Sequence, residues 1–412
     1  MNEHFDTLET RDPSLRERAQ MAALPAQVAH AKARTRAYAT LLADVDPRDI
    51  GSLTALERLP VVRKSELLEL QQSNRPFGGF AATRWGEARL VFASPGPIYE
   101  PEGRDADHWR IARALFAAGF RAGELVHNCF SYHLTPGGAM LESGAHALGC
   151  TVFRGGTGQS EQQVRAMTDL KPQGYVGTPS FLRIILDKAA ELGVTLGSVT
   201  KALVSGEAFP SSLRDAFAAK GIAAYQAYAS ADVGSIAYES IARDGLIVDE
   251  GVLVEIVRPG TGEQVDEGEV GEVVVTLLHN REYPLIRFGT GDLSAVLPGI
   301  SACGRTNMRI KGWLGRADQT AKVRGMFVHP SQVAAILKRH PEIVRARLVV
   351  DSTDGADRMT LHAEVAHNAS SNTDSILASI RDITKLRGEV AFHNPGDLAN
   401  DGKVIDDTRK YD

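Results

Sequence analysis

Short apolar strands and amphipathic helices alternate between residues 125 and 219, and this pattern limits the fold more than any other feature of the chain. Each strand is followed by a helix long enough to cross back over a sheet, which is the signature of parallel strands covered by helices. The strands are predicted at 125–129, 151–153, 174–176 and 201–204, and the helices at 137–148, 161–170, 180–192 and 210–219.

The spacing of apolar residues is different in the regions on either side of this segment. Helical spacing runs from Leu15 to Leu42, where we expect Pro25 to break the helix into two pieces. A helix is also predicted from Asp107 to Ala118. Antiparallel strands are predicted after Asp244. The predicted fold class is therefore α/β: a large N-terminal domain (1–317) of parallel-sheet αβ layers plus a β subdomain, and a small mobile α+β C-terminal domain (318–412).

Composition excludes several classes of protein. The net charge of −5 gives no general attraction to nucleic acid, which depends on Lys and Arg neutralising phosphates. The three cysteines lie far apart, which argues against a disulfide framework and fits a reducing compartment. The N-terminus is charged and has no apolar signal region, and no long apolar run predicts a membrane span. We therefore expect a cytoplasmic protein with no membrane or nucleic-acid partner.

Four motifs occur in a fixed order along the second half of the chain. They are Tyr228–Asp232, Pro284–Leu293, the pair Gly315–Asp318 and Lys322–Gly325, and Asp401–Val404. In this order and spacing they resemble the "YGxTE", "RTGDL", "GRxD…KxxG" and C-terminal "GK" motifs of the adenylate-forming enzyme superfamily. Each motif is weak by itself, but the ordered set is a specific signal.

Further segments resemble the phenylacetate–CoA ligase branch of that superfamily. They are Glu9–Pro13, Leu59-Pro60, Arg63–Leu67, Gly155–Gln159, Lys171-Pro172, Thr178–Ser180 and Pro298-Gly299. The resemblance implies an AMP-forming acyl-CoA ligase that joins an aryl or arylacetic acid to ATP and then transfers the acyl group to CoA. It implies ATP/AMP, Mg²⁺ and coenzyme A as cofactors, a small carboxylic acid as the other partner, and a homodimer.

The same resemblance assigns the nucleotide-binding residues. Asp292 would accept hydrogen bonds from the ribose hydroxyls, and Arg316 would contact the ribose or a phosphate with its forked guanidinium. Tyr228 would stack on the base, although a tyrosine on a strand is equally often a core residue. The remaining nucleotide-binding residues implied are Ser205, Gly206, Glu207, Ala208 and Ser230.

Other roles are carried over in the same way. Lys403 would be the catalytic lysine that stabilises charge during adenylation, against the alternative of a solvated terminal lysine. Asp318 would be the hinge between the two half-reactions. Asp232, where the family has Glu, would bind Mg²⁺. The implied CoA-binding residue is Gly325, and the implied acyl-pocket residues are Tyr132, His133 and Gly137, with a structural histidine as the alternative for His133.

The main departure from the family lies where it has a Ser/Thr/Gly-rich phosphate loop with a lysine. Residues 93–103 contain three prolines and no lysine, and Glu100 and Glu102 add negative charge where polyphosphate would sit. The sequence therefore predicts poor handling of ATP unless the loop folds away. Two alternatives to a ligase stay open: an ATP-independent acyltransferase that retains Asp292, Arg316 and Lys403, and a non-catalytic nucleotide- or acyl-CoA-binding pseudoenzyme.

Overall fold

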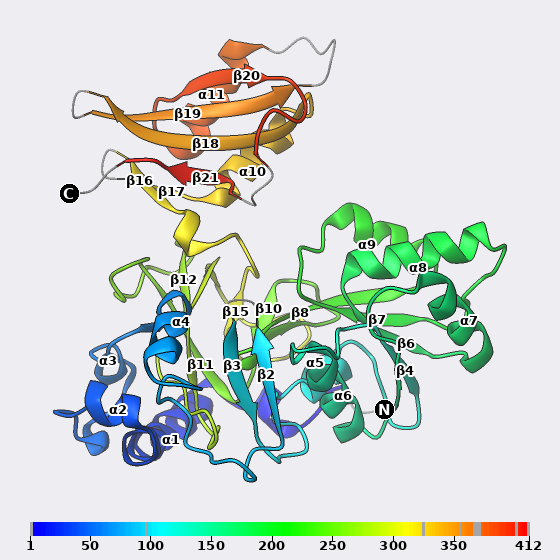
Figure 1. Cartoon of the computed structure of the whole chain (residues 1–412), viewed down its shortest axis with the longest axis vertical. Coiled ribbons are helices and arrows are strands. Elements are labelled where there is room, and N and C mark those ends of the chain that lie inside the picture. The colour runs from blue at the N-terminus through cyan, green and yellow to red at the C-terminus, as the bar shows by residue number, and fades with distance from the viewer. Residues whose placement is uncertain are drawn as a thin grey trace. The chain divides into compact units, whose positions relative to one another are not determined.

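The structure is a computed structural model that describes residues 3–94, 97–323, 326–353, 356–365, 372–399 and 403–409. The chain divides into two compact units (Figure 1). Unit 1 contains Met1–Thr290 and Ser294–Trp313, and unit 2 contains Gly291–Leu293 and Leu314–Asp412. The chain thus enters unit 2 at Gly291–Leu293 and again at Leu314. The boundary expected at Asp318 and the roles of the two parts as adenylate-binding domain and lid stay predictions.

The largest sheet of unit 1 has nine strands among the described residues, in the order β14-β15-β10-β9-β8-β7-β6-β4-β5. Neighbouring strands from β5 to β8 are parallel, as the alternating pattern predicts, and β8 pairs antiparallel with β9. The strands are β4 Leu125–Asn128, β5 Thr151–Arg154, β6 Gly174–Gly177, β7 Lys201–Val204, β8 Ala223–Ser230, β9 Gly234–Glu239, β10 Leu246–Val248, β14 Val296–Leu297 and β15 Arg309–Ile310.

Helices cover both faces of the parallel half of this sheet (Figure 1). Successive residues of a strand point to opposite faces, so Tyr175 packs in the cluster that contains α7, α8 and α9 residues, whereas Val176 packs with α5 and α6 residues. Both clusters are apolar, which explains why these strands read as continuous hydrophobic runs. The helices are α5 Ala112–Ala117, α6 Gly137–Ala147, α7 Ser160–Leu170, α8 Pro179–Glu191 and α9 Ser211–Ala218.

A second sheet in the order β1-β13-β12-β11 and the N-terminal helices complete this part of the chain. β11 and β12 are antiparallel, as predicted for this region. The segments are η1 Thr7–Thr10, α1 Pro13–Arg34, α2 Arg36–Leu41, η2 Pro47–Asp49, α3 Leu53–Leu56, β1 Val62–Arg63, α4 Lys64–Ser73, the hairpin strands β2 Leu90–Ser94 and β3 Ile98–Glu102, β11 Val252–Val257, β12 Gly271–Leu277 and β13 Phe288–Ser294.

Arg287, immediately before β13, is 2% exposed and joins several of these segments. Its five N–H groups all donate: two to the carboxylate of Glu255 (2.9 and 3.1 Å) and three to the carbonyl oxygens of Glu57, Leu59 and Gly262 (2.7–2.8 Å). The backbone of Arg287 has a left-handed φ of +46°, a conformation that costs a non-glycine residue free energy. A fully paired guanidinium offsets that cost and fixes the start of β13.

The N-terminal segment is held by a second buried carboxylate. Glu9 is 1% exposed, and its Oε1 accepts hydrogen bonds from the Tyr238 hydroxyl (2.6 Å) and from Nε of Arg305 (2.8 Å). Its Oε2 accepts from the backbone N–H of Phe5 at 2.7 Å. The segment therefore packs against β9 and the loop before β15 as part of the core.

Unit 2 is an α/β layer with its own apolar core. Its main sheet has the order β20-β19-β18-β21, with α10 and α11 packed against it, and a small hairpin of β16 and β17 precedes it. The segments are η3 Ala317–Gln319, β16 Ala321–Val323, β17 Met326–Val328, α10 Pro330–Arg339, β18 Ile343–Thr353, β19 Ala356–Val365, α11 Thr373–Thr384, β20 Glu389–His393 and β21 Ile405–Asp407.

Two helix predictions are wrong, for local reasons. Pro25 does not break α1, and the break falls at Thr35, whose hydroxyl caps α2 by accepting from the Tyr38 amide. The helix predicted from Asp107 begins instead at Ala112, because the Asp107 carboxylate accepts from the amides that open it and Arg110 is left-handed (φ +59°). Within the described part of the chain, every helix is too short or too polar to cross a bilayer.

Candidate functional site

The end of β8 and the turn that follows it contain three of the predicted site residues. Tyr228 is buried, and its hydroxyl donates to Oγ1 of Thr290 at 3.3 Å, so the ring packs in the core between the two sheets of unit 1. Ser230 and Asp232 follow it in the turn, where the two side-chain oxygens lie 3.4 Å apart. Gly234 closes the turn with φ +73°, and a Cβ there would lie 2.8 Å from the Trp109 carbonyl oxygen. Only glycine fits this close approach.

Asp232 is a buried carboxylate paired with a lysine. Its side chain is fully buried, and Oδ2 lies 2.6 Å from Nζ of Lys64, the first residue of α4. Its other oxygen, Oδ1, is buried with no hydrogen-bond partner among the described residues. A buried polar atom without a partner is costly and calls for a ligand or water. The turn therefore presents one unused carboxylate oxygen next to a positive charge.

The β2–β3 hairpin occupies the place of the expected phosphate loop. Glu100 and Glu102 are 0% and 2% exposed, so the hairpin buries both side chains instead of presenting them to solvent. Burial, followed by the nearby charge of Asp232, raises the pKa of Glu100 to about 8, and the Ser94 hydroxyl lies 2.5 Å from its Oε1. At neutral pH, Glu100 is therefore largely a neutral acid. Of the three prolines in residues 93–103, Pro95 lies outside the described residues.

α4 and the hairpin are joined by a reciprocal pair of hydrogen bonds. Gln71 donates from Nε2 to the Tyr99 carbonyl oxygen at 2.9 Å and accepts at Oε1 from the Tyr99 amide at 2.8 Å. These bonds hold α4 beside β3, and thereby place Lys64 close to Glu100, which its charge partly stabilises in the ionised form.

The predicted adenine loop, Ser205 to Ala208, follows β7 at the carboxyl end of the parallel strands, where open α/β sheets bind ligands. Its Glu207 accepts a hydrogen bond at 2.6 Å from the amide of Ser180 in the first turn of α8. Gly206 is left-handed (φ +84°), and a Cβ there would lie 3.8 Å from the Phe130 ring.

The predicted acyl-pocket residues lie around the start of α6. The Tyr132 hydroxyl donates to Oε2 of Glu142 at 2.8 Å, and Nε of Arg154 donates to the same oxygen at 2.6 Å, with the guanidinium over the Tyr132 ring. Burial is the first cause that raises the pKa of Tyr132, so it stays a neutral donor. The side chain of His133 is exposed. A Cβ on Gly137 would lie 3.4 Å from the Phe130 side chain, which therefore separates the predicted acyl pocket from the adenine loop.

Asp292 and Arg316 are held as a pair within unit 2. Their backbones form an isolated antiparallel bridge, and the guanidinium lies 3.3 Å from the carboxylate. Gly291 makes this possible, because a Cβ there would meet the guanidinium at 2.8 Å. The left-handed φ of +76° is what requires glycine here, and a side chain at this position would also push the Arg316 guanidinium aside.

The other predicted residues of unit 2 are placed less fully. Lys403 lies just before β21, with Nζ 2.9 Å from Asp406 and a side chain that is 53% exposed. Asp318 lies in the 3₁₀ turn after Arg316. Gly325 lies outside the described residues.

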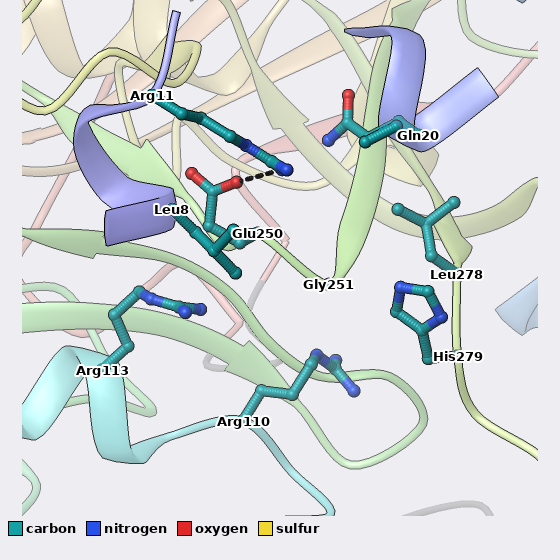
Figure 2. Close-up of a pocket in the computed structure, with 10 residues that line it drawn as sticks. Leu8, Arg11, Gln20, Arg110, Arg113, Glu250, Gly251, Leu278 and His279 are labelled. Carbon is teal, nitrogen blue, oxygen red and sulfur yellow. Dashed lines mark hydrogen bonds and ion pairs between the residues drawn. The ribbon is translucent and has the colours of Figure 1, made fainter. Parts of the chain in front are cut away.

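An arginine-lined pocket of about 240 Å³ lies elsewhere in unit 1 and contains none of the predicted site residues (Figure 2). Arg11 reaches Glu250 across it at 2.7 Å (Figure 2). Arg110 and Arg113 each pair with Asp249, at 3.3 and 3.2 Å. Because its charges are compensated by carboxylates, this pocket is a structural ion-pair network that braces the N-terminal segment.

Comparison with known proteins identifies the family. A family model described as "AMP-binding enzyme" matches residues 110–277. The phenylacetate–coenzyme A ligase of Thermus thermophilus is 34% identical, with 82% of this chain and 79% of that protein covered. The enzyme of the same name from Aromatoleum evansii is 33% identical, with 78% and 74% covered. The chain belongs to the phenylacetate–CoA ligase branch of the adenylate-forming superfamily.

Solved structures agree with this family at the level of the fold. A crystal structure of 2-hydroxyisobutyryl-CoA ligase in an open conformation, in complex with 2-HIB-AMP and CoA, superposes with a TM-score of 0.86 at 24% identity and covers 98% of this chain and 94% of that one. By its family this protein is an AMP-forming acid–CoA ligase, and ATP/AMP, CoA and a small carboxylic acid are its reactants.

The turn of this ligase fits a magnesium ion only in part. Among the described residues, no group of three or more His, Cys, Asp or Glu side chains could hold a metal. Asp232 offers one unused oxygen, which suits a Mg²⁺ ion that takes its other ligands from phosphates and water. Lys64 already neutralises the other oxygen of that carboxylate.

The sequence motifs do not identify two residues of this region. Lys64 lies in the Arg63–Leu67 segment that resembles the branch, but nothing in the sequence pairs it with a residue 168 positions away. Phe130 precedes the predicted acyl-pocket residues in the sequence. Only the folded chain brings its side chain next to both Gly137 and Gly206.

We predict that Lys64→Met destabilises the protein by about 3 kcal/mol, because it leaves the buried charge of Asp232 unpaired. The double variant Lys64→Met/Asp232→Asn should recover most of this loss, as measured by urea unfolding. Lys220→Met, at an exposed lysine, is the matched control. Equal losses in the double and single variants would contradict an ion pair.

A second prediction concerns pH. The pKa of Glu100 rises from 4.5 to about 8 on folding, so between these values the folded state keeps a proton that the unfolded state has released. Stability should therefore fall as pH rises through this window, by at most about 1.4 kcal/mol per pH unit. Glu100→Gln should flatten the fall in Tm between pH 5 and 8, whereas the control Glu69→Gln, at an exposed site, should not. If the plots of Tm against pH were parallel for the wild type and both variants, the titration of Glu100 would be ruled out.

Proposed function

We propose that this CoA ligase activates an aryl or arylacetic acid as an acyl-adenylate and then transfers the acyl group to CoA. The observation that carries the proposal is the match of 78% and 82% of the chain to two phenylacetate–CoA ligases. The ordered motifs support it, because Asp292 and Arg316 lie side by side and offer a carboxylate and a guanidinium to one ligand. These two side chains would contact the ribose hydroxyls and the phosphate.

The residues at the β8–β9 turn would handle the phosphates. Lys64 replaces the lysine that the altered loop lacks, and its ammonium group would attract the polyphosphate. A magnesium ion held by Oδ1 of Asp232 and by the phosphates would neutralise developing charge. Glu100 would stay protonated, so that it does not repel the nucleotide. Tyr228 would border the base as a buried ring.

The remaining roles complete the proposal. Lys403 would stabilise the α-phosphate during adenylation, Asp318 would be the hinge, and Gly325 would contact CoA. Ser205 to Ala208 would border the adenine. Ser230, in the Tyr228–Asp232 motif, would also contact the nucleotide. Tyr132, His133 and Gly137 would line the acid pocket. We also propose a cytoplasmic homodimer, which rests on the cysteine pattern and on the family.

Pyrophosphate exchange into ATP tests the acid class. We expect exchange with phenylacetate or benzoate at least tenfold faster than with 2-hydroxyisobutyrate, because the predicted pocket lies beside the Phe130 ring. Faster exchange with the aliphatic acid would contradict the aryl assignment. No exchange with any acid, by a protein that is folded and binds AMP, would contradict ATP-dependent adenylation.

We predict that Lys403→Ala slows adenylation by about 10²- to 10³-fold, because one positioned positive charge is lost from the transition state. The CoA step, started from a synthetic acyl-adenylate, should change much less. Lys338→Ala, at an exposed lysine of α10, is the control. If both half-reactions fell equally, the role of Lys403 in adenylation alone would be wrong.

The second candidate is an acyltransferase that uses acyl-adenylate and CoA but not ATP. It is favoured by the β2–β3 hairpin, because the pairing of Tyr99 with Gln71 uses backbone groups that a phosphate loop would offer to ATP. Calorimetry of AMP and of ATP·Mg²⁺ separates the two: binding of both supports the ligase, and binding of AMP alone supports the transferase.

A further inference from the structure

A second pocket of unit 1, of about 310 Å³, is formed by α2 and the segment between α4 and β2. Its lining includes Arg36 from α2 and Arg75 and Arg84 from the segment. Trp85 lies beside Arg84 in the sequence and in the lining. None of these residues belongs to the motifs of the ligase site. The volume lies at the lower end of the range for small-molecule sites.

The three arginines bring positive charge to the pocket. All three side chains are exposed, and among the described residues none of them forms an ion pair. This differs from the pocket in Figure 2, where each arginine has a carboxylate partner. Three guanidinium groups around one concave surface repel each other and attract an anion with several oxygens.

The pocket also offers an aromatic surface and an unused polar atom. Trp85 is 71% exposed, and its ring is held 5.7 Å from that of Phe77, which is buried. A fixed, solvent-facing indole is a platform on which a planar base can stack. Thr83, in the same lining, has a buried Oγ1 with no hydrogen-bond partner in the described part of the chain.

We propose that this pocket binds a phosphorylated adenosine, with the base on Trp85 and a phosphate monoester among Arg36, Arg75 and Arg84. Two sources share this chemistry: the 3′-phosphoadenosine end of coenzyme A, and free ATP. The first source rests on the proposed ligase function, whereas the pocket itself does not. A concave pocket with one exposed ring favours a single small ligand over an anionic membrane, which would need a broader apolar surface.

The test titrates the full chain with adenosine 3′,5′-bisphosphate, coenzyme A, dephospho-coenzyme A and ATP, and follows tryptophan fluorescence. The chain has three tryptophans, of which Trp109 is 2% exposed, so Trp85→Phe shows which signal comes from the pocket. The bisphosphate should quench the wild-type emission, and Trp85→Phe should lose most of that change. Calorimetry measures the affinity of each ligand independently of fluorescence.

The variant Arg75→Gln/Arg84→Gln should bind the bisphosphate at least about tenfold more weakly, because two charged hydrogen-bond donors are lost. The matched control is Arg183→Gln, at an exposed arginine of α8. Tenfold weaker binding of dephospho-coenzyme A than of coenzyme A identifies the coenzyme as the source, and displacement of the bisphosphate by ATP at similar concentration identifies the free nucleotide.

Unchanged affinity of the double variant for the bisphosphate would overturn the proposal. The proposal would also be overturned if the protein bound anionic lipid vesicles in a co-sedimentation assay but bound none of the four nucleotides. The outcome is separate from that of the ligase assay. A protein that shows no pyrophosphate exchange but binds the bisphosphate through Arg75 and Arg84 would contradict the ligase and support the pocket.

Discussion

The buried guanidinium of Arg287 is the interaction on which the rest of unit 1 depends. It joins the segment before β1, strand β11 and the turn after it to the start of β13, and all five of its N–H groups are used. A buried charge that is paired and fully hydrogen-bonded adds little net free energy, but its removal leaves several partners unsatisfied. The guanidinium fixes the position of the start of β13, and this strand also contains Gly291 and Asp292.

The charged groups at the β8–β9 turn come from segments other than the expected phosphate loop. The expected loop lysine is missing, yet Lys64 brings an ammonium group to Asp232 from another segment of the chain. The two added glutamates are buried, and Glu100 is neutral over most of the physiological pH range. The fold thus brings a positive charge from α4 to this turn and keeps the two glutamates of the hairpin buried.

The sequence predicted the elements that obey a single periodicity. The parallel strands at 125–204 and the helices that follow them were found because apolar spacing alone determines them. The predictions failed where one side chain decides. The Asp107 carboxylate accepts from the amides of Ile111 and Ala112, and α5 begins five residues later than predicted. Thr35, rather than Pro25, marks the break after α1. Pairings such as Lys64 with Asp232 join distant segments, so no local pattern contains them. The motif residues were found by resemblance, and their roles stay predictions.

Glu9 has a consequence for synthesis of the chain. Its partner Arg305 lies 296 positions later in the sequence, and Tyr238 lies 229 positions later. At translation rates of about 5 to 20 residues per second, Glu9 waits roughly 15 to 60 s for Arg305 to emerge. During that interval the N-terminal segment has no native site, and β9, once it has been synthesised, leaves the face that the segment covers open. The first dozen residues therefore stay exposed through most of synthesis, and the strand surface that later buries them stays exposed until Arg305 has emerged.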